Sequence, residues 1–252
     1  LHLGDIGMIS GLGGAGAKAF EQTISRFVIY RSDQVICVSA AAESIARLLG
    51  ANRTVVIRNA VDVEEFTPSP VEENSLLYIG RLVHNNGIQD LLSALPGVLD
   101  VHPDATVHIV GSGPLEAEIH ETIQRTGLSD AVTVYDYVPD ISVVYDRASV
   151  FCRPSYSEGL PLTMLEAMAS GVPPLVTAIA GVPEVVTDRE TGILLEPGRP
   201  DNIEATIIEL FDDEAFRAEI AENARDYVVN NLTWEQRTER VIEVYDQVVG
   251  ND

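Results

Sequence analysis

Residues 154–183, PSYSEGLPLTMLEAMASGVPPLVTAIAGVP, carry the densest pattern in this chain of 252 residues. A loop with Glu158 and Gly159 leads into a helix that starts near Pro161 and contains Glu166. Proline is favoured in the first turn of a helix, where its missing N–H group would have no partner in any case. An apolar strand and a second helix start marked by proline follow. The stretch therefore predicts strand, loop and helix units of an α/β sheet.

Apolar runs and amphipathic segments alternate on both sides of this stretch. We predict strands at residues 76–79, 106–110, 132–135, 150–152, 175–177 and 192–195. We predict helices at residues 88–99, 114–125, 141–148, 161–170, 201–210, 214–229 and 234–249. Strands that are apolar throughout and separated by helices are typical of a parallel sheet covered on both faces. The predicted fold class is α/β, with a parallel sheet and helices on both of its faces.

The first 74 residues are less regular. We predict helices at 17–31 and 40–49, strands at 35–38 and 55–57, and a turn with a short helical segment at 59–66. Ser39 is the expected cap of the second helix. Residues 11–16, GLGGAG, have the spacing of a dinucleotide-binding loop, but no clear strand precedes them, so a flexible loop is favoured. Residues 67–74, TPSPVEEN, lack apolar periodicity and predict a linker.

The chain carries 39 Asp and Glu residues against 16 Lys and Arg, a formal net charge of -23. The acidic residues are spread over every segment, and Lys18 is the single lysine. Nonspecific binding to nucleic acid or to an anionic membrane is disfavoured, because both are negatively charged. A solvated, self-repelling surface is favoured over an acidic docking patch. Salt screens such repulsion, so origin from a halophile is our hypothesis.

Cysteines and histidines give no sign of a disulfide framework or of a metal site. Cys37 and Cys152 lie in apolar runs, which predicts buried thiols in a reducing cytoplasm. The five histidines lack metal-ligand spacing, so no metal is predicted. No apolar run approaches the ~20 residues of a membrane-spanning helix. We expect a cytoplasmic protein, and peripheral contact with the inner face of the membrane stays open.

Ligands bind beyond the carboxyl ends of the strands in open parallel sheets, so the residues after each strand are the candidates for binding. These are Arg81 after the first strand of the regular region, Gly111 and Gly113 after the second, Val138 after the third and residues 155–161 after the fourth. They include glycines that permit close approach of a ligand, one cation, and a glutamate just before a helix start. The pattern predicts one site at this edge of the sheet.

The helix that starts at Pro161 directs free N–H groups and the positive end of its dipole toward the space beyond Gly159, which favours phosphate. Glu166 lies more than one turn into this helix, where a carboxylate can accept hydrogen bonds from the two hydroxyls of a ribose. Arg81 is suited to neutralise a diphosphate. Together these residues predict a site for a nucleoside diphosphate. Two alternatives stay open: Glu158 as an acid that complements the helix dipole, and Glu166 on an exposed helix face.

Four motifs then carry a resemblance to a known family. They are GRLVHNNGIQDLL (80–92), IVGSGPLEAEI (109–119), PSYSEGLPLTMLEAMASGVPPLV (154–176), and GVPEVV with RETGILLEPG (within 181–198). This part is similar to the C-terminal domain of retaining glycosyltransferases of the GT-B fold, family-4 type. VICVSAAAESIARLLG and VVIRNAVDVEEFTP resemble the end of that family's N-terminal domain. The most specific mark is the E-x7-E spacing of Glu158 and Glu166.

The resemblance implies two facing Rossmann-like domains with a nucleotide-sugar donor in the cleft. It implies a remnant of the N-terminal, acceptor-side domain at residues 1–66, a linker at 67–74, the nucleotide-sugar-binding domain at 75–230 and a helix at 231–252 that crosses back to the N-terminal domain. A complete N-terminal domain would carry about 100 more residues. We therefore expect an N-terminally truncated chain.

The resemblance also implies roles for single residues. Glu158 contacts the transferred sugar, Glu166 holds the donor ribose, and Arg81 neutralises the leaving diphosphate, which makes Arg81 and Glu158 the candidate catalytic residues. The other donor-binding candidates are Asn86, Gly111, Gly113, Val138 beside the base, and Gly159, Leu160, Leu162 and Thr163 around the diphosphate. Asn86 stands where the family usually has a lysine. Loss of one such preorganised charge costs roughly 3 kcal/mol of transition-state stabilisation.

The implied reaction moves a sugar from a UDP-, GDP- or ADP-sugar donor to an acceptor with retention of anomeric configuration, without a cofactor. The sequence does not indicate whether the acceptor is a sugar, a lipid or another small molecule. Two alternatives remain. A non-catalytic nucleotide-sugar-binding or regulatory protein of the same fold is permitted by Asn86, and a nucleotide-sugar epimerase is disfavoured by the E-x7-E spacing.

Overall fold

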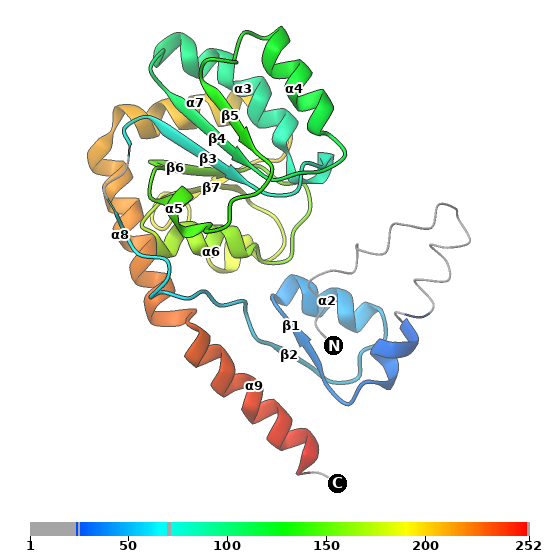
Figure 1. Ribbon diagram of the computed structural model, residues 1–252. Helices are drawn as coiled ribbons and strands as arrows, with labels where there is room; N and C mark the ends of the chain where they lie inside the picture. The colour runs from blue at the N-terminus through cyan, green and yellow to red at the C-terminus, as the bar shows by residue number, and fades with distance from the viewer. Residues whose placement is uncertain (1–23, 25, 70–71, 251–252) are drawn as a thin grey trace.

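Two parallel sheets frame the molecule in the computed structural model, which describes residues 24, 26–69 and 72–250 (Figure 1). The larger sheet has six strands in the spatial order β5-β4-β3-β6-β7-β8. The bounds are Ser75–Ile79 for β3, Thr106–Val110 for β4, Val132–Tyr135 for β5, Val150–Arg153 for β6, Pro174–Thr177 for β7 and Ile193–Leu195 for β8. All neighbouring strands in it are parallel. The predicted α/β fold class is confirmed.

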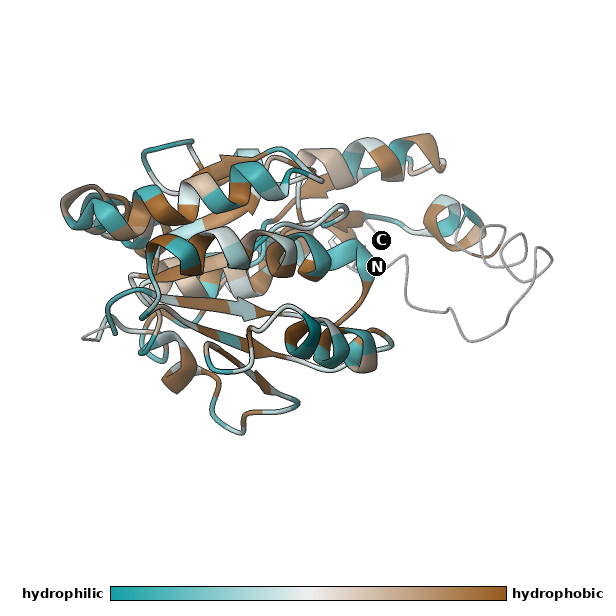
Figure 2. Ribbon diagram, turned by 90° about the horizontal axis from the view of Figure 1, so that it is seen from above, coloured by the Kyte–Doolittle hydropathy of each residue, from teal (hydrophilic) through white to brown (hydrophobic). Residues whose placement is uncertain are grey.

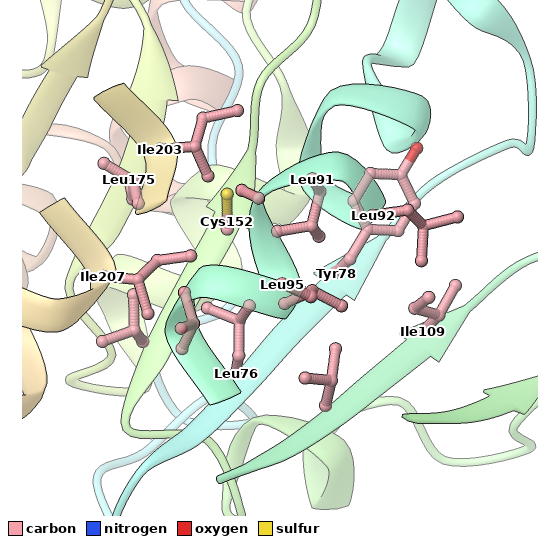
Figure 3. Packing of buried hydrophobic residues seen from close by; sticks show 14 of the residues in the cluster. Leu76, Tyr78, Leu91, Leu92, Leu95, Ile109, Cys152, Leu175, Ile203 and Ile207 are labelled. Atoms are coloured by element: carbon pink, nitrogen blue, oxygen red, sulfur yellow. The ribbon is translucent and has the colours of Figure 1, made fainter. Parts of the chain in front are cut away.

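Helices cover both faces of this sheet, and strand residues alternate between two apolar cores. Leu76 and Tyr78 of β3 belong to the core shared with α3, α4 and α7, part of which Figure 3 shows. Leu77 and Ile79 belong to the core shared with α5, α6 and α8. The helices are α3 (Ile88–Val101), α4 (Glu116–Arg125), α5 (Ser142–Tyr145), α6 (Leu162–Ala169), α7 (Pro200–Asp212) and α8 (Glu214–Asn231). Because successive side chains of a strand point to opposite faces, β3 is buried at every position.

The smaller sheet pairs β1 (Val35–Cys37) with β2 (Thr54–Val56) and packs against α2 (Ala40–Leu48). Ser39 caps α2 as predicted, since its hydroxyl oxygen accepts a hydrogen bond from the N–H group of Ala42 (3.1 Å). Residues 26–31 are helical. The GLGGAG stretch and the start of the helix predicted from residue 17 lie outside the described residues.

The last helix, α9 (Trp234–Val249), continues from α8 toward the smaller sheet (Figure 1). Arg237 donates a hydrogen bond from Nε to the carbonyl oxygen of Arg58 (3.2 Å). Arg240 donates from Nη2 to the carbonyl oxygen of Val56 (3.1 Å). These bonds attach the end of the described chain to its beginning.

The outer helices carry both polar and apolar residues, whereas the strands between them are mainly apolar (Figure 2). No helix in the described ranges combines the length and the apolar composition that crossing a membrane requires. Over the same ranges, His, Cys, Asp and Glu side chains form no group of three or more that could hold a metal ion.

The predicted bounds differ from the structure at several segments. The helix predicted at residues 141–148, for example, covers only Ser142–Tyr145 in the structure. β6 continues to Arg153, one residue beyond the predicted end of this strand, because Arg153 still pairs with β7. Residues 59–66 form a turn without the short helical segment that we predicted. There the carboxylate of Asp62 accepts hydrogen bonds from the N–H groups of Glu64 (3.0 Å) and Glu65 (3.1 Å). Such local side-chain bonds compete with helix formation.

Gly87 is a position where we expect a side chain to destabilise the fold. It lies between the short 3-10 helix η1 (His84–Asn86) and α3 with φ 72°, and a Cβ atom there would clash with the carbonyl oxygen of Pro154. Left-handed backbone costs an L-residue ~1–2 kcal/mol and overpacking adds ~1–3 kcal/mol. We therefore expect Gly87→Ala to lower the free energy of unfolding by about 3 kcal/mol or more, measured by chemical denaturation.

Gly127→Ala is the matched control, because Gly127 has φ 73° and open space where a Cβ atom would be. It carries the backbone strain without the clash, so its loss of stability should stay near ~1–2 kcal/mol. Equal losses in the two variants would show that the loop of Gly87 is not docked on Pro154.

Candidate functional site

The strand order determines where the site lies. β3 and β6 are neighbours, but the chain continues from β3 to β4 on one side and from β6 to β7 on the other. At such a switch point a crevice opens beyond the carboxyl ends of the strands, and ligands bind there. Arg81 follows β3 and Glu158 follows β6, so both predicted residues follow strands that adjoin at the switch point. A cavity of about 380 Å³ is lined by Glu158, by the start of α6, and by Val38, Asn59 and Trp234. Arg81 is not among its lining residues.

Glu158 is held by an ion pair that the sequence pattern did not reveal. Arg153, the last residue of β6, donates from Nε to Glu158 Oε1 (2.8 Å), and its Nη2 lies 2.7 Å from the same oxygen. Ser155 Oγ also donates to Oε1 (2.8 Å). The side chains of Arg153 and Glu158 are only 12% and 14% exposed. Glu158 is therefore a fixed carboxylate and more than an acid that complements a helix dipole.

Glu166 lies on α6 and is held by Tyr145 of α5, a contact that no sequence signal indicated. The Tyr145 hydroxyl donates to Glu166 Oε2 (2.7 Å) and lies 3.1 Å from the carbonyl oxygen of Thr163. Burial raises the pKa of Glu166; the hydrogen bond from Tyr145 opposes this shift, and the charge of Glu65 adds to it. The alternative of an exposed helix face is therefore wrong, because the carboxylate is partly buried.

The loop before α6 is fixed by contacts from two distant segments. Asn59 donates from Nδ2 to the carbonyl oxygen of Leu160 (2.7 Å). The N–H group of Gly181 donates to the carbonyl oxygen of Gly159 (3.0 Å). Both carbonyl groups are thereby occupied, and within the described chain no side chain caps the start of α6. The first N–H groups of this helix thus remain available to a ligand.

Leu162 and Thr163 form the first turn of α6. Leu162 is 46% exposed, whereas the Thr163 hydroxyl accepts a hydrogen bond from Arg153 Nη1 (3.0 Å). The same nitrogen donates to the carbonyl oxygen of Ile79 at the end of β3 (3.0 Å). Arg153 therefore joins β3, β6 and α6 where they meet.

Arg81 and Asn86 share one loop but differ in exposure. Arg81 is exposed, and its side chain forms no ion pair with any residue that the structure describes. Asn86 is buried and donates from Nδ2 to the carbonyl oxygen of Arg81 (2.9 Å). The N–H group of Tyr156 donates to the carbonyl oxygen of Asn85 (2.7 Å). The loop with Asn86 is thereby docked on the loop with Glu158.

Gly111, Gly113 and Val138 follow β4 and β5 as predicted. Cβ atoms on Gly111 and Gly113 would clash with the carbonyl oxygens of Gly80 and Leu82, respectively. Close approach of the strand ends is thus sufficient to explain both glycines, and their contact with a donor stays a prediction. Val138 is half-buried against the core shared with α6.

Glu184, at the end of the 3-10 helix η2 (Val182–Glu184), links the large sheet to the part of the chain that contains β1, α2 and β2, here called the N-terminal unit. Its Oε1 accepts hydrogen bonds from the N–H groups of Ala40 (2.8 Å) and Ala41 (3.4 Å) at the start of α2. Its Oε2 pairs with Arg58 Nη2 (3.2 Å). A carboxylate at a helix N-terminus is favoured by the helix dipole. The sequence motif gave no indication of this partner, because 144 residues separate Glu184 from Ala40.

Comparison with known proteins supplies independent evidence. The family model described as "Glycosyl transferases group 1" matches residues 62–227. An uncharacterised glycosyltransferase of Methanocaldococcus jannaschii is 27% identical over 265 residues, which cover 97% of this chain and 67% of that protein. The solved sucrose-phosphate synthase of Thermosynechococcus elongatus is 26% identical, with a TM-score of 0.85, over 96% of this chain and 65% of the other.

A further structure, HepE of Anabaena in complex with UDP, has a TM-score of 0.84 at 23% identity, over 98% of this chain and 71% of its own. At that identity the likeness shows the fold alone. The chain spans roughly two thirds of the length of these relatives. The family model matches more than half of this chain, and the sheet has the strand order of a Rossmann-like domain. The chain therefore belongs to the group 1 glycosyl transferases and has a GT-B type fold.

Proposed function

We propose that this chain binds a nucleoside-diphosphate sugar at the switch point of its large sheet and takes part in the transfer of the sugar to an acceptor. One observation carries the proposal: the uncapped start of α6 lies between two carboxylates, Glu158 and Glu166, that neighbouring side chains hold in place. A phosphate-binding helix start flanked by acceptors for hydroxyl groups matches a ligand with a diphosphate in its middle and a sugar at each end.

The diphosphate is assigned to the first turn of α6. The N–H groups of this turn have no partner within the helix, and the helix dipole favours negative charge at that end. Arg81 adds an exposed positive charge from the neighbouring strand end. As the bond between sugar and phosphate breaks, negative charge develops on the phosphate. Preorganised donors of this kind stabilise the developing charge without reorganisation.

The ribose is assigned to Glu166. Tyr145 occupies Oε2, and no other described residue donates a hydrogen bond to the carboxylate. Oε1 is therefore the oxygen that remains for ribose hydroxyls. The hydrogen bond from the buried Tyr145 fixes the direction of the group, so little side-chain entropy is lost when a ribose binds.

The transferred sugar is assigned to Glu158. Arg153 and Ser155 both occupy Oε1, and across the described ranges Oε2 has no hydrogen-bond donor. Glu158 lines the cavity next to the start of α6. Retention of anomeric configuration is part of the proposal and is supported by the resemblance of residues 154–176 to retaining enzymes.

UDP is the first nucleotide to test, because HepE was solved with it. GDP and ADP complete the panel. Calorimetric titration tests binding, and incubation with the corresponding sugar nucleotides tests transfer or hydrolysis of the donor. The anomeric proton signals of the product, read by NMR, test retention. Absence of binding to all three nucleotides by the folded chain would refute the proposed donor site.

A second function is favoured by Asn86. Its amide is buried and used within the loop, so this position contributes no second cation to the site. A nucleotide-sugar-binding protein without turnover has the same donor site and lacks only this charge. Binding of a nucleotide together with no turnover over a panel of donors and acceptors would support it.

Glu166→Gln separates binding from stability. Because burial raises the pKa of Glu166 in the folded chain, ionisation of this carboxylate costs more free energy in the folded state than in the unfolded state. We expect Glu166→Gln to leave the melting temperature unchanged or higher, while UDP affinity falls about 10–100-fold through loss of charge-assisted hydrogen bonds to the ribose. Glu158→Gln is the control for stability: it breaks an ion pair with Arg153 and should lower the melting temperature. Unchanged UDP affinity in Glu166→Gln would contradict the ribose assignment.

Arg81→Gln tests the cation that follows β3. Removal of one charge-assisted contact to phosphate should weaken UDP binding about tenfold or more and leave the much weaker binding of uridine unaffected. Arg125→Gln, an exposed residue at the end of α4, changes the net charge equally and should have no effect on either ligand. An equal loss for UDP and uridine would assign Arg81 to the nucleoside instead.

A further inference from the structure

Arg153 contacts several segments of the proposed donor site. Its guanidinium contacts Glu158, Ser155, Thr163 and the carbonyl oxygen of Ile79 at distances between 2.7 and 3.3 Å. These partners come from the loop after β6, the start of α6 and the end of β3. Arg153 therefore sets the relative position of the segments that are to receive the diphosphate and the sugar.

The contact with Glu158 is one-sided. Nε and Nη2 of Arg153 both approach Oε1, and Ser155 donates to the same oxygen. A carboxylate commonly receives the arginine fork on both of its oxygens. Here the three donors converge on one oxygen, and among the described residues Oε2 is left without a donor. The arrangement fixes the carboxylate while leaving one oxygen for a ligand.

Arg153 also offsets the negative charge of Glu158, which would otherwise disfavour an anion nearby. The carboxylate is only 14% exposed, and Glu158 lies in the loop before α6, the helix to whose start the diphosphate is assigned. Water screens the negative charge of a partly buried carboxylate less than that of an exposed one. Without a partner, the charge of Glu158 would therefore repel a bound diphosphate. The Arg153 guanidinium carries the opposite charge within hydrogen-bond distance of Glu158 and is itself 12% exposed. The pair has no net charge.

We infer that Arg153 is a positioning residue that enables anion binding beside Glu158: it offsets the charge of this carboxylate and directs Oε2 toward the donor sugar. This inference rests on the proposed function, because it assumes that a diphosphate binds at the start of α6. It assigns Arg153 a role through Glu158 and requires no contact between Arg153 and the ligand.

The guanidinium is suited to both parts of this role. Its planar fork reaches Glu158, Thr163 and the Ile79 carbonyl oxygen at once, whereas an ammonium group is a compact point charge. Gly80 leaves room for the group, since a Cβ atom there would lie 3.2 Å from Arg153 Nη1. Lysine at this position would keep the charge and lose the convergent geometry.

A double-mutant cycle that removes the two charges tests the inference by titrating UDP into the full chain at constant salt. Arg153→Met leaves the Glu158 charge without a partner and should weaken UDP binding at least about tenfold, or about 1.4 kcal/mol. Adding Glu158→Gln to this variant should restore most of the lost affinity, because the repelling charge is then absent. Such rescue in a double-mutant cycle identifies a coupling between the two residues, which a purely structural role of Arg153 would not produce.

Two further variants keep the test decisive if Arg153→Met fails to fold. Arg153→Lys keeps the charge and should bind UDP within about threefold of the unmodified chain. Glu158→Gln alone leaves a positive charge beside the diphosphate and should bind UDP equally well or more tightly. Arg125→Met, at the exposed end of α4, controls for the change in net charge and should have no effect.

The outcomes distinguish the inference from the proposed function. If the folded, unmodified chain binds none of UDP, GDP and ADP, the proposed function fails and the inference fails with it. If the chain binds UDP and Arg153→Met binds it equally well, only the inference is overturned. Loss of affinity in Arg153→Met that Glu158→Gln does not restore also overturns it, as does a tenfold weaker binding of UDP to Glu158→Gln alone.

Discussion

The reversal of strand order between β3 and β6 is the constraint on which the site depends. Two neighbouring parallel strands send the chain to opposite edges of the sheet, so the loops after them diverge and leave a crevice. The loops are nevertheless in contact: Gly87 adjoins the backbone of Pro154, and Tyr156 donates to the carbonyl oxygen of Asn85. The sheet thus determines where a ligand binds, and the contacts between loops determine how rigid that place is.

A chain with a net charge of -23 binds an anion only where its charge is locally offset. The start of α6 does this with backbone N–H groups and a helix dipole, which do not depend on composition. The two carboxylates are managed in different ways. Glu158 is neutralised by Arg153, whereas Glu166 receives a neutral hydrogen bond from Tyr145 and keeps a raised pKa. The difference in partners matches the difference in the proposed ligands, one carboxylate being beside a diphosphate and the other beside ribose hydroxyls.

The N-terminal unit is attached to the large sheet at the same loops. Asn59 holds the carbonyl oxygen of Leu160, Glu184 caps α2, and α9 contacts the backbone near β2. A hydrogen bond contributes a net ~0.5–1.5 kcal/mol, and one to a charged group ~1.5–3 kcal/mol. One of the bonds between the units holds the carbonyl group of Leu160, in the loop that leads into α6. The position of this loop therefore depends on the N-terminal unit.

The sequence by itself determined the α/β class, the six strands of the large sheet and the family, because apolar periodicity and motif spacing are local properties of the chain. Glu158, Glu166 and the helix start between them were predictable for the same reason, since all three lie within one short stretch. Arg153, Tyr145 and Glu184 were not, because their roles arise from contacts between segments that folding brings together. Only the tertiary structure decided that Glu158 is paired on a single oxygen and that Asn86 is turned into its own loop. Spacing predicts which residues reach a site, and packing decides which of their atoms remain free to act there.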